Sequence, residues 1–296
     1  MATTTSANPS AAKLTPALCP PSYRVDGRAF VVTGGTQGLG LGIAKQLQFC
    51  GAKGLVIVGR NRDSGAQVCQ ELTTDQCTCR FVEADLSDAS QAQQVIPQAI
   101  ELMQEADVGL PISGVINAAA TTARGNLMTT TAADFDLQFA INVRAPFLIT
   151  QAAAQHMIER KVSNGSIVNI GSVAAHGGAP FIMAYSASKA ALAVLTKNNA
   201  AELAPHGIRV NGITLGWCYT DNEDRLQSSQ SSDGAQWINK ADDGVPLGRI
   251  LRPADVASTV GFLLSDSAAL LTGSMIDLHP DYAHGMLSLL PEDNRL

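Results

Sequence analysis

AFVVTGGTQGLG, the stretch from Ala29 to Gly40, decides the fold of this chain. It begins as a short apolar strand, passes through a glycine-rich turn and opens an amphipathic helix that runs to Phe49. Glycines let a pyrophosphate approach the backbone, and the amino terminus of a helix presents free N–H groups with partial positive charge. The strand, turn and helix together therefore predict a dinucleotide site, in preference to an ordinary glycine turn.

Strand patterns and helix-length segments alternate along the rest of the chain. The segments that we interpret as strands are Ala29–Thr33, Leu55–Val58, Arg80–Glu83, Gly114–Asn117, Ser166–Ile170, Arg209–Ile213 and Ser274–Leu278. Such alternation is typical of α/β proteins, in which parallel strands are joined by helices. It predicts a single doubly wound Rossmann-type domain with a seven-stranded parallel sheet flanked by helices.

The composition excludes several functional classes. The chain has 296 residues, of which 46% are hydrophobic and 16% charged, which is enough material for one large core. A net charge of −6 offers no basic patch for nucleic acid, and no apolar run approaches the ~20 residues that span a bilayer. We therefore expect a small-molecule substrate, and no nucleic-acid or membrane partner.

The first 24 residues differ in composition from the rest of the chain. They are rich in Thr, Ala, Ser and Pro and contain no acidic residue, which favours a disordered extension ahead of a catalytic domain at 25–296. Organelle targeting is the alternative, although one Lys and one Arg make a poor basic helix. The six cysteines include no C-x-x-C pair, so we expect reduced thiols, a cytoplasmic protein and no metal site.

A second stretch, SVAAHGGAPFIMAYSASK from Ser172 to Lys189, holds a hydroxyl, a phenol and an ammonium that can converge. Ser172 follows a buried strand, while Tyr185 and Lys189 lie at i and i+4 on one face of a helix. Bringing the pKa of a phenol near neutrality requires roughly 4 kcal/mol of charge stabilisation, which a close ammonium can supply. Tyr-x-x-x-Lys alone also occurs on ordinary helix faces, so the interpretation depends on the glycine motif as well.

The two motifs, T-G-x-x-x-G-x-G and Y-x-x-x-K, together resemble those of the short-chain dehydrogenase/reductase family. The resemblance implies an enzyme that transfers a hydride between a nicotinamide cofactor and a ketone or secondary alcohol. It implies that Tyr185 donates the proton and that Ser172 orients the carbonyl oxygen. It also implies that Lys189 holds the nicotinamide ribose and lowers the pKa of Tyr185, and that Asn142 positions a water of the proton relay.

The same resemblance implies a set of cofactor-binding residues from the glycine turn, the strand ends and the segment after the sixth strand. These are Gly34, Thr36, Gln37, Gly38, Leu39, Gly40, Asp85, Leu86, Asn117, Ala118, Ala119, Tyr185, Lys189, Gly216, Cys218 and Thr220. Three positions depart from the family pattern. Ile116 and Ala119 replace an Asn and a Gly after the fourth strand, and Leu215 replaces a Pro, which is expected to loosen the following turn.

The end of the second strand indicates the cofactor. Its sequence, VIVGRN, carries Arg60 and no acidic residue, whereas NAD sites usually place a carboxylate there for the ribose 2′-hydroxyl. Arg60 can pair with a 2′-phosphate through charge-assisted hydrogen bonds. We therefore predict NADP(H) in preference to NAD(H), against the alternative that Arg60 is only a solvated charge.

The stretch at 216–250 is expected to be the longest irregular segment and to form a substrate lid, with a solvated surface insertion as the alternative. The residues expected at the substrate are His176, Phe181, Trp217 and Tyr219. This mixture of aromatic and polar groups favours a small polar or sugar-like ketone. The alternatives are a hydrophobic or cyclic ketone of secondary metabolism, and a non-catalytic nucleotide-binding regulatory protein.

Two long helices are expected to support self-association. The segments at about Asp134–Arg160 and Met183–Ala204 are apolar over more of their surface than one sheet-facing stripe requires. Members of the resembled family commonly form dimers or tetramers through long helices. We therefore expect a homotetramer or a homodimer.

Overall fold

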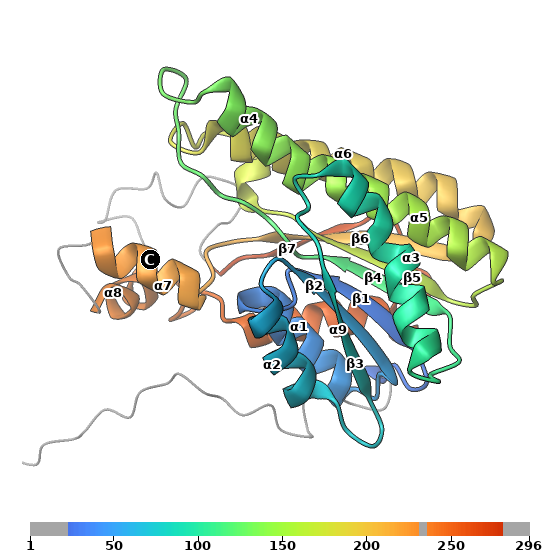
Figure 1. Cartoon of the computed structure of the whole chain (residues 1–296). Helices are drawn as coiled ribbons and strands as arrows, with labels where there is room; N and C mark the ends of the chain where they lie inside the picture. The colour runs from blue at the N-terminus through green and yellow to red at the C-terminus, as the bar shows by residue number, and fades with distance from the viewer. Residues whose placement is uncertain (1–22, 231–235, 281–296) are drawn as a thin grey trace, which may run out of the picture.

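The computed structural model describes residues 23–230 and 236–280. In it, seven parallel strands form one sheet, in the order β3-β2-β1-β4-β5-β6-β7 (Figure 1). The strands are β1(Ala29–Thr33), β2(Gly54–Gly59), β3(Thr78–Glu83), β4(Ile112–Asn117), β5(Gly165–Ile170), β6(Ile208–Leu215) and β7(Met275–Leu278). The predicted fold class is confirmed, and each predicted strand is present to within two residues at either end.

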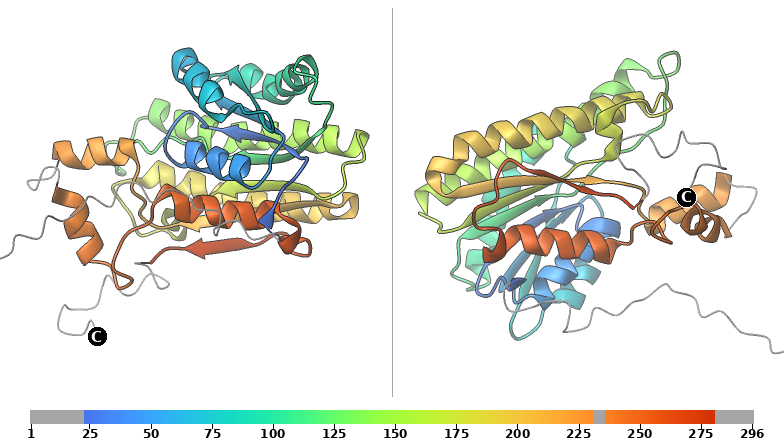
Figure 2. Two further views of the ribbon diagram at one scale, coloured as in Figure 1. Left: turned by 90° about the horizontal axis from the view of Figure 1, so that it is seen from below. Right: turned by 180° about the vertical axis from the view of Figure 1, so that it is seen from behind.

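Helices cover both faces of this sheet, so its central strands are buried on both sides. The α-helices are α1(Gly38–Phe49), α2(Arg62–Leu72), α3(Ala89–Glu105), α4(Ala132–Phe139), α5(Ala145–Glu159), α6(Met183–Leu203), α7(Asp221–Gln230), α8(Trp237–Asp243) and α9(Pro253–Leu264). One face packs against α1, α2 and α9, and the other against α3, α5 and α6 (Figure 2). Burial on both faces explains why the strands are continuous runs of Val, Ile and other apolar residues.

The strand order reverses at β1, which pairs with β2 on one side and with β4 on the other. The loops that leave β1 and β4 therefore turn to opposite faces of the sheet. In doubly wound folds, this divergence leaves a crevice at the carboxyl ends of the two strands, where ligands bind. The glycine turn after β1 lies at this point.

The helix expected at about Asp134–Arg160 is interrupted. A π-helical turn, Ala140–Arg144, separates α4 from α5 and contains Asn142. A turn of this kind widens the helix by one residue and often marks a functional position.

The segment from 216 to 250 is more regular than predicted, because it contains α7 and α8. Both helices lie together to one side of the sheet (Figure 1). The prediction for the first 24 residues falls outside the described residues, except at Tyr23 and Arg24. Among the helices that the structure describes, none is long and apolar enough to cross a membrane.

Candidate active site

The glycine turn between β1 and α1 has room for an anionic group. Gly34 and Gly38 have φ values of +68° and +54°, which favour glycine, and a Cβ on Gly40 would lie 2.3 Å from the Gly34 carbonyl oxygen. The amino terminus of α1 has no side-chain cap at Gln37 and no acidic residue in its first turn. Its first N–H groups are therefore available to a phosphate, so the turn fits the pyrophosphate of a dinucleotide.

The turn after β4 is tied to β1 by one hydroxyl. Thr33 Oγ1 accepts hydrogen bonds from the backbone N–H groups of Ala118 and Ala119, at 3.0 and 3.1 Å. A Cβ on Gly34 would lie 3.0 Å from the Ala119 Cα. The two loops that flank the crevice are thus held against each other, and Ala119 is accommodated where the family pattern has Gly.

Asn117 points away from the crevice, although it was predicted to bind the cofactor. Its side chain is buried and donates a 2.8 Å hydrogen bond to Asn169 Oδ1 on β5, and Asn169 donates to Thr196 Oγ1 on α6 at 2.9 Å. These polar groups link β4, β5 and α6 beneath the site. The predicted contact of Asn117 with a cofactor stays a prediction, and Asn169 and Thr196 were not predicted.

At the adenosine end of the crevice, Arg60 and Asp85 follow β2 and β3. Arg60 is exposed, and its charge contributes to the lowered pKa of the Asp85 carboxyl. The larger causes are hydrogen bonds from the backbone N–H and hydroxyl of Ser87, at 2.9 and 2.8 Å. Leu86 is buried in the apolar core and presents little surface to a ligand.

Ser172, Tyr185 and Lys189 converge, as predicted. Ser172 begins a 3₁₀ turn after β5, and Tyr185 lies in the first turn of α6, hydrogen-bonded to the Ser172 side chain. Lys189 lies one turn further along α6. Its buried ammonium donates a 2.7 Å hydrogen bond to the Ile170 carbonyl and lies 5.6 Å from the centroid of the Tyr185 ring.

The electrostatics of this group differ from the prediction for Tyr185. Burial raises the pKa of the Tyr185 phenol, and the hydrogen bond with Ser172 only partly opposes this effect. Burial also lowers the pKa of Lys189 to about 8. The expected lowering of the Tyr185 pKa by Lys189 was wrong for this state of the site. The Lys189 ammonium donates to the Ile170 carbonyl, and burial is the largest cause of the shift in the Tyr185 pKa.

Asn142 is buried at the back of the site. Its Oδ1 accepts from the Thr121 N–H at 2.9 Å, and its Nδ2 donates to the Thr121 carbonyl at 2.9 Å and to Ser188 Oγ at 3.0 Å. Ser188 donates in turn to the Tyr185 carbonyl at 2.7 Å. The sequence prediction included Asn142 but missed Thr121 and Ser188. Ser188 could have been noticed in the sequence, because it is a hydroxyl residue in an Ala-rich helix, three residues after Tyr185.

The turn after β6 is held firmly despite the absence of the family's proline. Gly216 N–H donates to the Leu278 carbonyl at 3.0 Å, and backbone hydrogen bonds join Leu251 to Trp217 and Tyr219 at 3.0 and 2.8 Å. The loosening expected from Leu215 stays a prediction. Leu215 is the last residue of β6 and lies in register with Leu278 of β7.

Cys218 and Thr220 follow this turn. Burial raises the pKa of the Cys218 thiol to about 12, so this thiol is a poor nucleophile. Thr220 Oγ1 accepts from the Glu223 N–H at 3.1 Å and so caps α7. The Thr220 methyl group would lie 3.6 Å from a Cβ on Gly38, which brings the start of α7 to the glycine turn.

The four residues predicted at the substrate fall into two sets. Tyr219 packs against buried Trp237, with ring centroids 6.1 Å apart, and the guanidinium of Arg252 lies 5.5 Å from the Tyr219 ring centroid. Tyr219 thus packs in the small apolar cluster beneath α8. By contrast, His176, Phe181 and Trp217 are exposed, with Phe181 at 56%.

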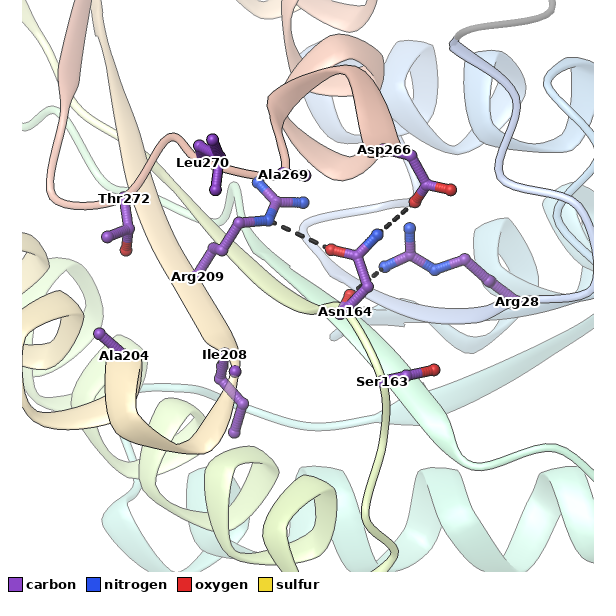
Figure 3. Close-up of a pocket in the computed structure, with 11 residues that line it drawn as sticks. Arg28, Ser163, Asn164, Ala204, Ile208, Arg209, Asp266, Ala269, Leu270 and Thr272 are labelled. Atoms are coloured by element: carbon purple, nitrogen blue, oxygen red, sulfur yellow. Dashed lines mark hydrogen bonds between the residues drawn. The ribbon is translucent and has the colours of Figure 1, made fainter.

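A separate cavity of about 800 Å³ lies at the opposite end of the sheet, where β1 and β6 begin (Figure 3). Arg28 and Arg209 donate there to backbone carbonyls at the carboxyl terminus of α9, and both contact Asn164. The two guanidinium groups balance the partial negative charge at the carboxyl terminus of α9 and link it to the first residues of β1 and β6. We assign this cluster to stability, because the nucleotide crevice lies at the carboxyl ends of the strands.

Comparisons with known proteins match this chain over most of its length. A family model described as enoyl-(acyl carrier protein) reductase matches residues 34–279. 2-(S)-hydroxypropyl-CoM dehydrogenase 3 of Xanthobacter autotrophicus is 34% identical over 254 residues, covering 86% of this chain and 95% of that protein. Carbonyl reductase [NADPH] 2 of Sus scrofa is 32% identical over 252 residues, covering 85% and 95% of the two chains.

A solved structure is similar over the same region. It is that of 3-oxoacyl (acyl-carrier-protein) reductase from Agrobacterium tumefaciens C58 with NADP bound. Its TM-score is 0.76 at 26% sequence identity, and the match covers 88% of this chain and 96% of that chain. The similarity therefore extends over nearly the whole sheet and its helices.

Proposed function

The chain belongs to the short-chain dehydrogenase/reductase family, and on that basis we propose that it reduces a ketone to a secondary alcohol with NADP(H), or catalyses the reverse oxidation. The observation that carries the proposal is the convergence of Ser172, Tyr185 and Lys189 at the carboxyl end of β5, at the same edge of the parallel sheet as the glycine turn. A hydroxyl, a phenol and an ammonium in this arrangement can bind and protonate a carbonyl oxygen.

The proposed cofactor site extends along the crevice. The free amino terminus of α1 and the turn from Gly34 to Gly40 would hold the pyrophosphate, and the segment from Gly216 to Thr220 would border the nicotinamide. When bound, NADPH supplies a hydride to the carbonyl carbon, so that ketone, NADPH and a proton give the alcohol and NADP⁺. Asp85, Ala118 and Ala119 would complete the adenosine side.

Arg60 is the proposed determinant of NADP(H) over NAD(H). It is exposed at the end of β2, where the residues that flank it, Gly59 and Asn61, are not acidic. A guanidinium at this position suits a 2′-phosphate. The NADPH named for the porcine relative and the NADP bound in the similar structure support the same preference.

Tyr185 is the proposed proton donor. Because burial raises the pKa of its phenol, the hydroxyl is protonated at neutral pH and can give its proton to a developing alkoxide. The Ser172 hydroxyl, already hydrogen-bonded to Tyr185, would hold the carbonyl oxygen. Lys189 would bind cofactor hydroxyls and return protons to the phenol, with Asn142 fixing the π-helical turn behind it.

The substrate proposed first is a small polar or sugar-like ketone, bound near His176 and beneath a lid formed by α7 and α8. A cyclic or aromatic ketone is the second candidate, and the hydrogen bonds of the lid favour it. Glu223 and Asp224 accept from the indole N–H groups of Trp217 and Trp237, at 2.9 and 2.8 Å. These carboxylates already have partners, whereas the rings of Phe181 and Trp217 are exposed and would suit an apolar ring.

We also propose that the protein is a homotetramer or a homodimer. Exposed apolar side chains on α4 and α5, at Phe135, Leu137, Phe147 and Ile158, lie on helices that pack beside α6 (Figure 1). Burying such residues against a second copy would favour association. A cytoplasmic location is part of the proposal, and the free thiols of the five described cysteines support it.

The function is tested by following oxidation of NADPH with panels of polar ketones, sugars and cyclic ketones. We expect turnover that Tyr185→Phe reduces at least about a hundredfold, as for loss of a general acid. Tyr23→Phe is the matched control, because Tyr23 packs on Phe262 away from the site. A purified protein that binds NADPH without turning over any carbonyl compound would favour the regulatory alternative.

A further inference from the structure

Two cysteine thiols meet where α2 packs on β3, the edge strand of the sheet. Cys69 lies on α2 and Cys79 on β3, and both are free thiols. Thr73, one turn after Cys69, fixes their separation. Its hydroxyl accepts a 3.1 Å hydrogen bond from the Cys79 N–H and donates to the Cys79 carbonyl at 3.4 Å. The carboxyl end of α2 is thereby held against the strand at Cys79.

The two thiols form an asymmetric hydrogen-bonded pair. Their side chains interact, which lowers the pKa of Cys69 and raises that of Cys79, and Cys69 is the more exposed of the two. The guanidinium of Arg80 also favours the Cys69 thiolate, while burial opposes it. Cys69 is therefore the thiol that ionises first, and Cys79 is in contact with it.

The pair is accessible to a small reagent. Cys69 and Cys79 both line a surface cavity of about 550 Å³, together with Arg62 and Arg80. Cys69 is partly exposed, whereas Cys79 is 1% exposed. Arg62 is ion-paired with Glu83 at 3.0 Å, so Arg80 is the lining cation that supports a thiolate at Cys69, the more accessible of the two positions.

We propose that Cys69 and Cys79 are a redox-active pair, in which Cys69 reacts with hydrogen peroxide and Cys79 then closes a disulfide. The Cys69 thiolate attacks one peroxide oxygen; an S–O bond forms, the O–O bond breaks, and the leaving hydroxide takes up a proton to give water. The Cys79 sulfur next attacks the Cys69 sulfur, an S–S bond forms and the S–O bond breaks. The second hydroxide leaves with the Cys79 proton as water, so the two sulfurs lose two electrons to the peroxide.

A third thiol nearby provides an internal control. Cys77 lies two residues before Cys79, but it is 2% exposed and does not line the cavity. Burial raises the pKa of the Cys77 thiol to about 11, so it is protonated under the same conditions. Oxidation at this edge of the sheet should therefore involve Cys69 and Cys79 and leave Cys77 reduced.

The test uses the reduced full-length protein, treated with a small excess of hydrogen peroxide, alkylated under denaturing conditions and digested. A tryptic peptide from Asp63 to Arg80 holds all three cysteines, so cleavage after Glu71 is needed to separate Cys69 from the other two. We expect the two resulting peptides to be joined by a disulfide. Cys77→Ser should retain this link, and Cys69→Ser should abolish it.

The Cys79→Ser variant tests the order of the two steps. We expect its Cys69 to stop at a sulfenic acid, which dimedone traps as a covalent adduct, while thermal unfolding shows that the variant is folded. In the wild-type protein, Cys69 should react with iodoacetamide at least about tenfold faster than Cys77. Loss of the link in Cys77→Ser, or equal alkylation rates of Cys69 and Cys77, would overturn the proposal. Neither readout depends on turnover of a carbonyl substrate.

Discussion

The side-chain amide of Asn142 donates a 3.0 Å hydrogen bond to the hydroxyl of Ser188, which ties the π-helical turn directly to the helix that carries the tyrosine and the lysine. Ser188 donates onward to the carbonyl of Tyr185. The position of the tyrosine along α6 is therefore coupled to the loop at Thr121 through two side chains.

Replacing Ser188 by Ala should impair catalysis without affecting cofactor binding. Asn142 would lose one of its hydrogen bonds, and the first turn of α6 would lose its link to the π-helical turn. We expect kcat to fall about tenfold, which corresponds to ~1.4 kcal/mol, with KM for NADPH unchanged and the pH profile displaced.

The matched control is Ser186→Ala, because the buried Ser186 hydroxyl has no hydrogen-bond partner among the described residues. Its removal should leave kcat within about twofold of the wild-type value. Equal losses in the two variants would mean that Ser188 acts only through helix stability.

Arg60→Asp should reverse the cofactor preference. The substitution removes the cation proposed to face the 2′-phosphate and supplies a carboxylate suited to a ribose 2′-hydroxyl. We expect kcat/KM with NADPH to fall about 10- to 100-fold, as for loss of a charged hydrogen bond of ~1.5–3 kcal/mol, and the value with NADH to rise.

Arg62→Ala serves as the control for Arg60, because Arg62 is ion-paired with Glu83 at 3.0 Å. Its effect on the ratio of the two kcat/KM values should be small. An unchanged ratio in Arg60→Asp would show that Arg60 is only a solvated charge.

Arg209→Met should destabilise the fold from the end of the sheet opposite the active site. Arg209 is buried and donates to the Leu263 and Ser265 carbonyls and to Asn164, at 2.7, 3.3 and 3.3 Å. Leaving those acceptors buried without a donor should lower the free energy of unfolding by about 2–4 kcal/mol, measured by denaturant titration. Lys45→Met removes an exposed ion pair with Glu71 and should change it by less than ~1 kcal/mol. Equal effects would contradict the role given to Arg209.

Stability should decrease as the pH falls below the ordinary histidine pKa of 6.5, partly because of His156. Burial and the charge of Arg160 lower the pKa of His156, whose Nε2 accepts a 3.2 Å hydrogen bond from the Ile112 N–H. Below pH 6.5 the unfolded chain takes up a proton that the folded chain still excludes, so unfolding is favoured. His156→Gln should reduce the slope of stability against pH between the lowered pKa and 6.5. An identical slope in both proteins would exclude His156 as a contributor.

The sequence was sufficient to predict the parallel sheet and the Ser172–Tyr185–Lys189 group, because strand periodicity and the two motifs are local signals. It was not sufficient to predict the direction of Asn117, which depends on the partner that Asn169 offers from a neighbouring strand. Ser188 was missed for the same reason, since its partner Asn142 lies 46 residues away in the chain.

Charge effects were the least predictable part of the site. The spacing of Tyr185 and Lys189 places both on one face of α6, but it does not specify where the ammonium points. The carbonyl of Ile170 provides its hydrogen-bond partner, and burial then dominates the pKa of the phenol. Similarly, the aromatic residues of the lid were predicted to face the substrate, whereas Tyr219 and Trp237 pack against each other.

The most direct test of the central claim is to follow a deuterium atom from the reactive carbon of NADPH to the product. With the best ketone from the substrate panel, we expect the alcohol formed by the wild-type protein to carry deuterium on its carbinol carbon. Tyr185→Phe should slow this transfer at least about a hundredfold while leaving the affinity for NADPH unchanged. An alcohol without deuterium, or a Tyr185→Phe variant that transfers deuterium at the wild-type rate, would contradict the account.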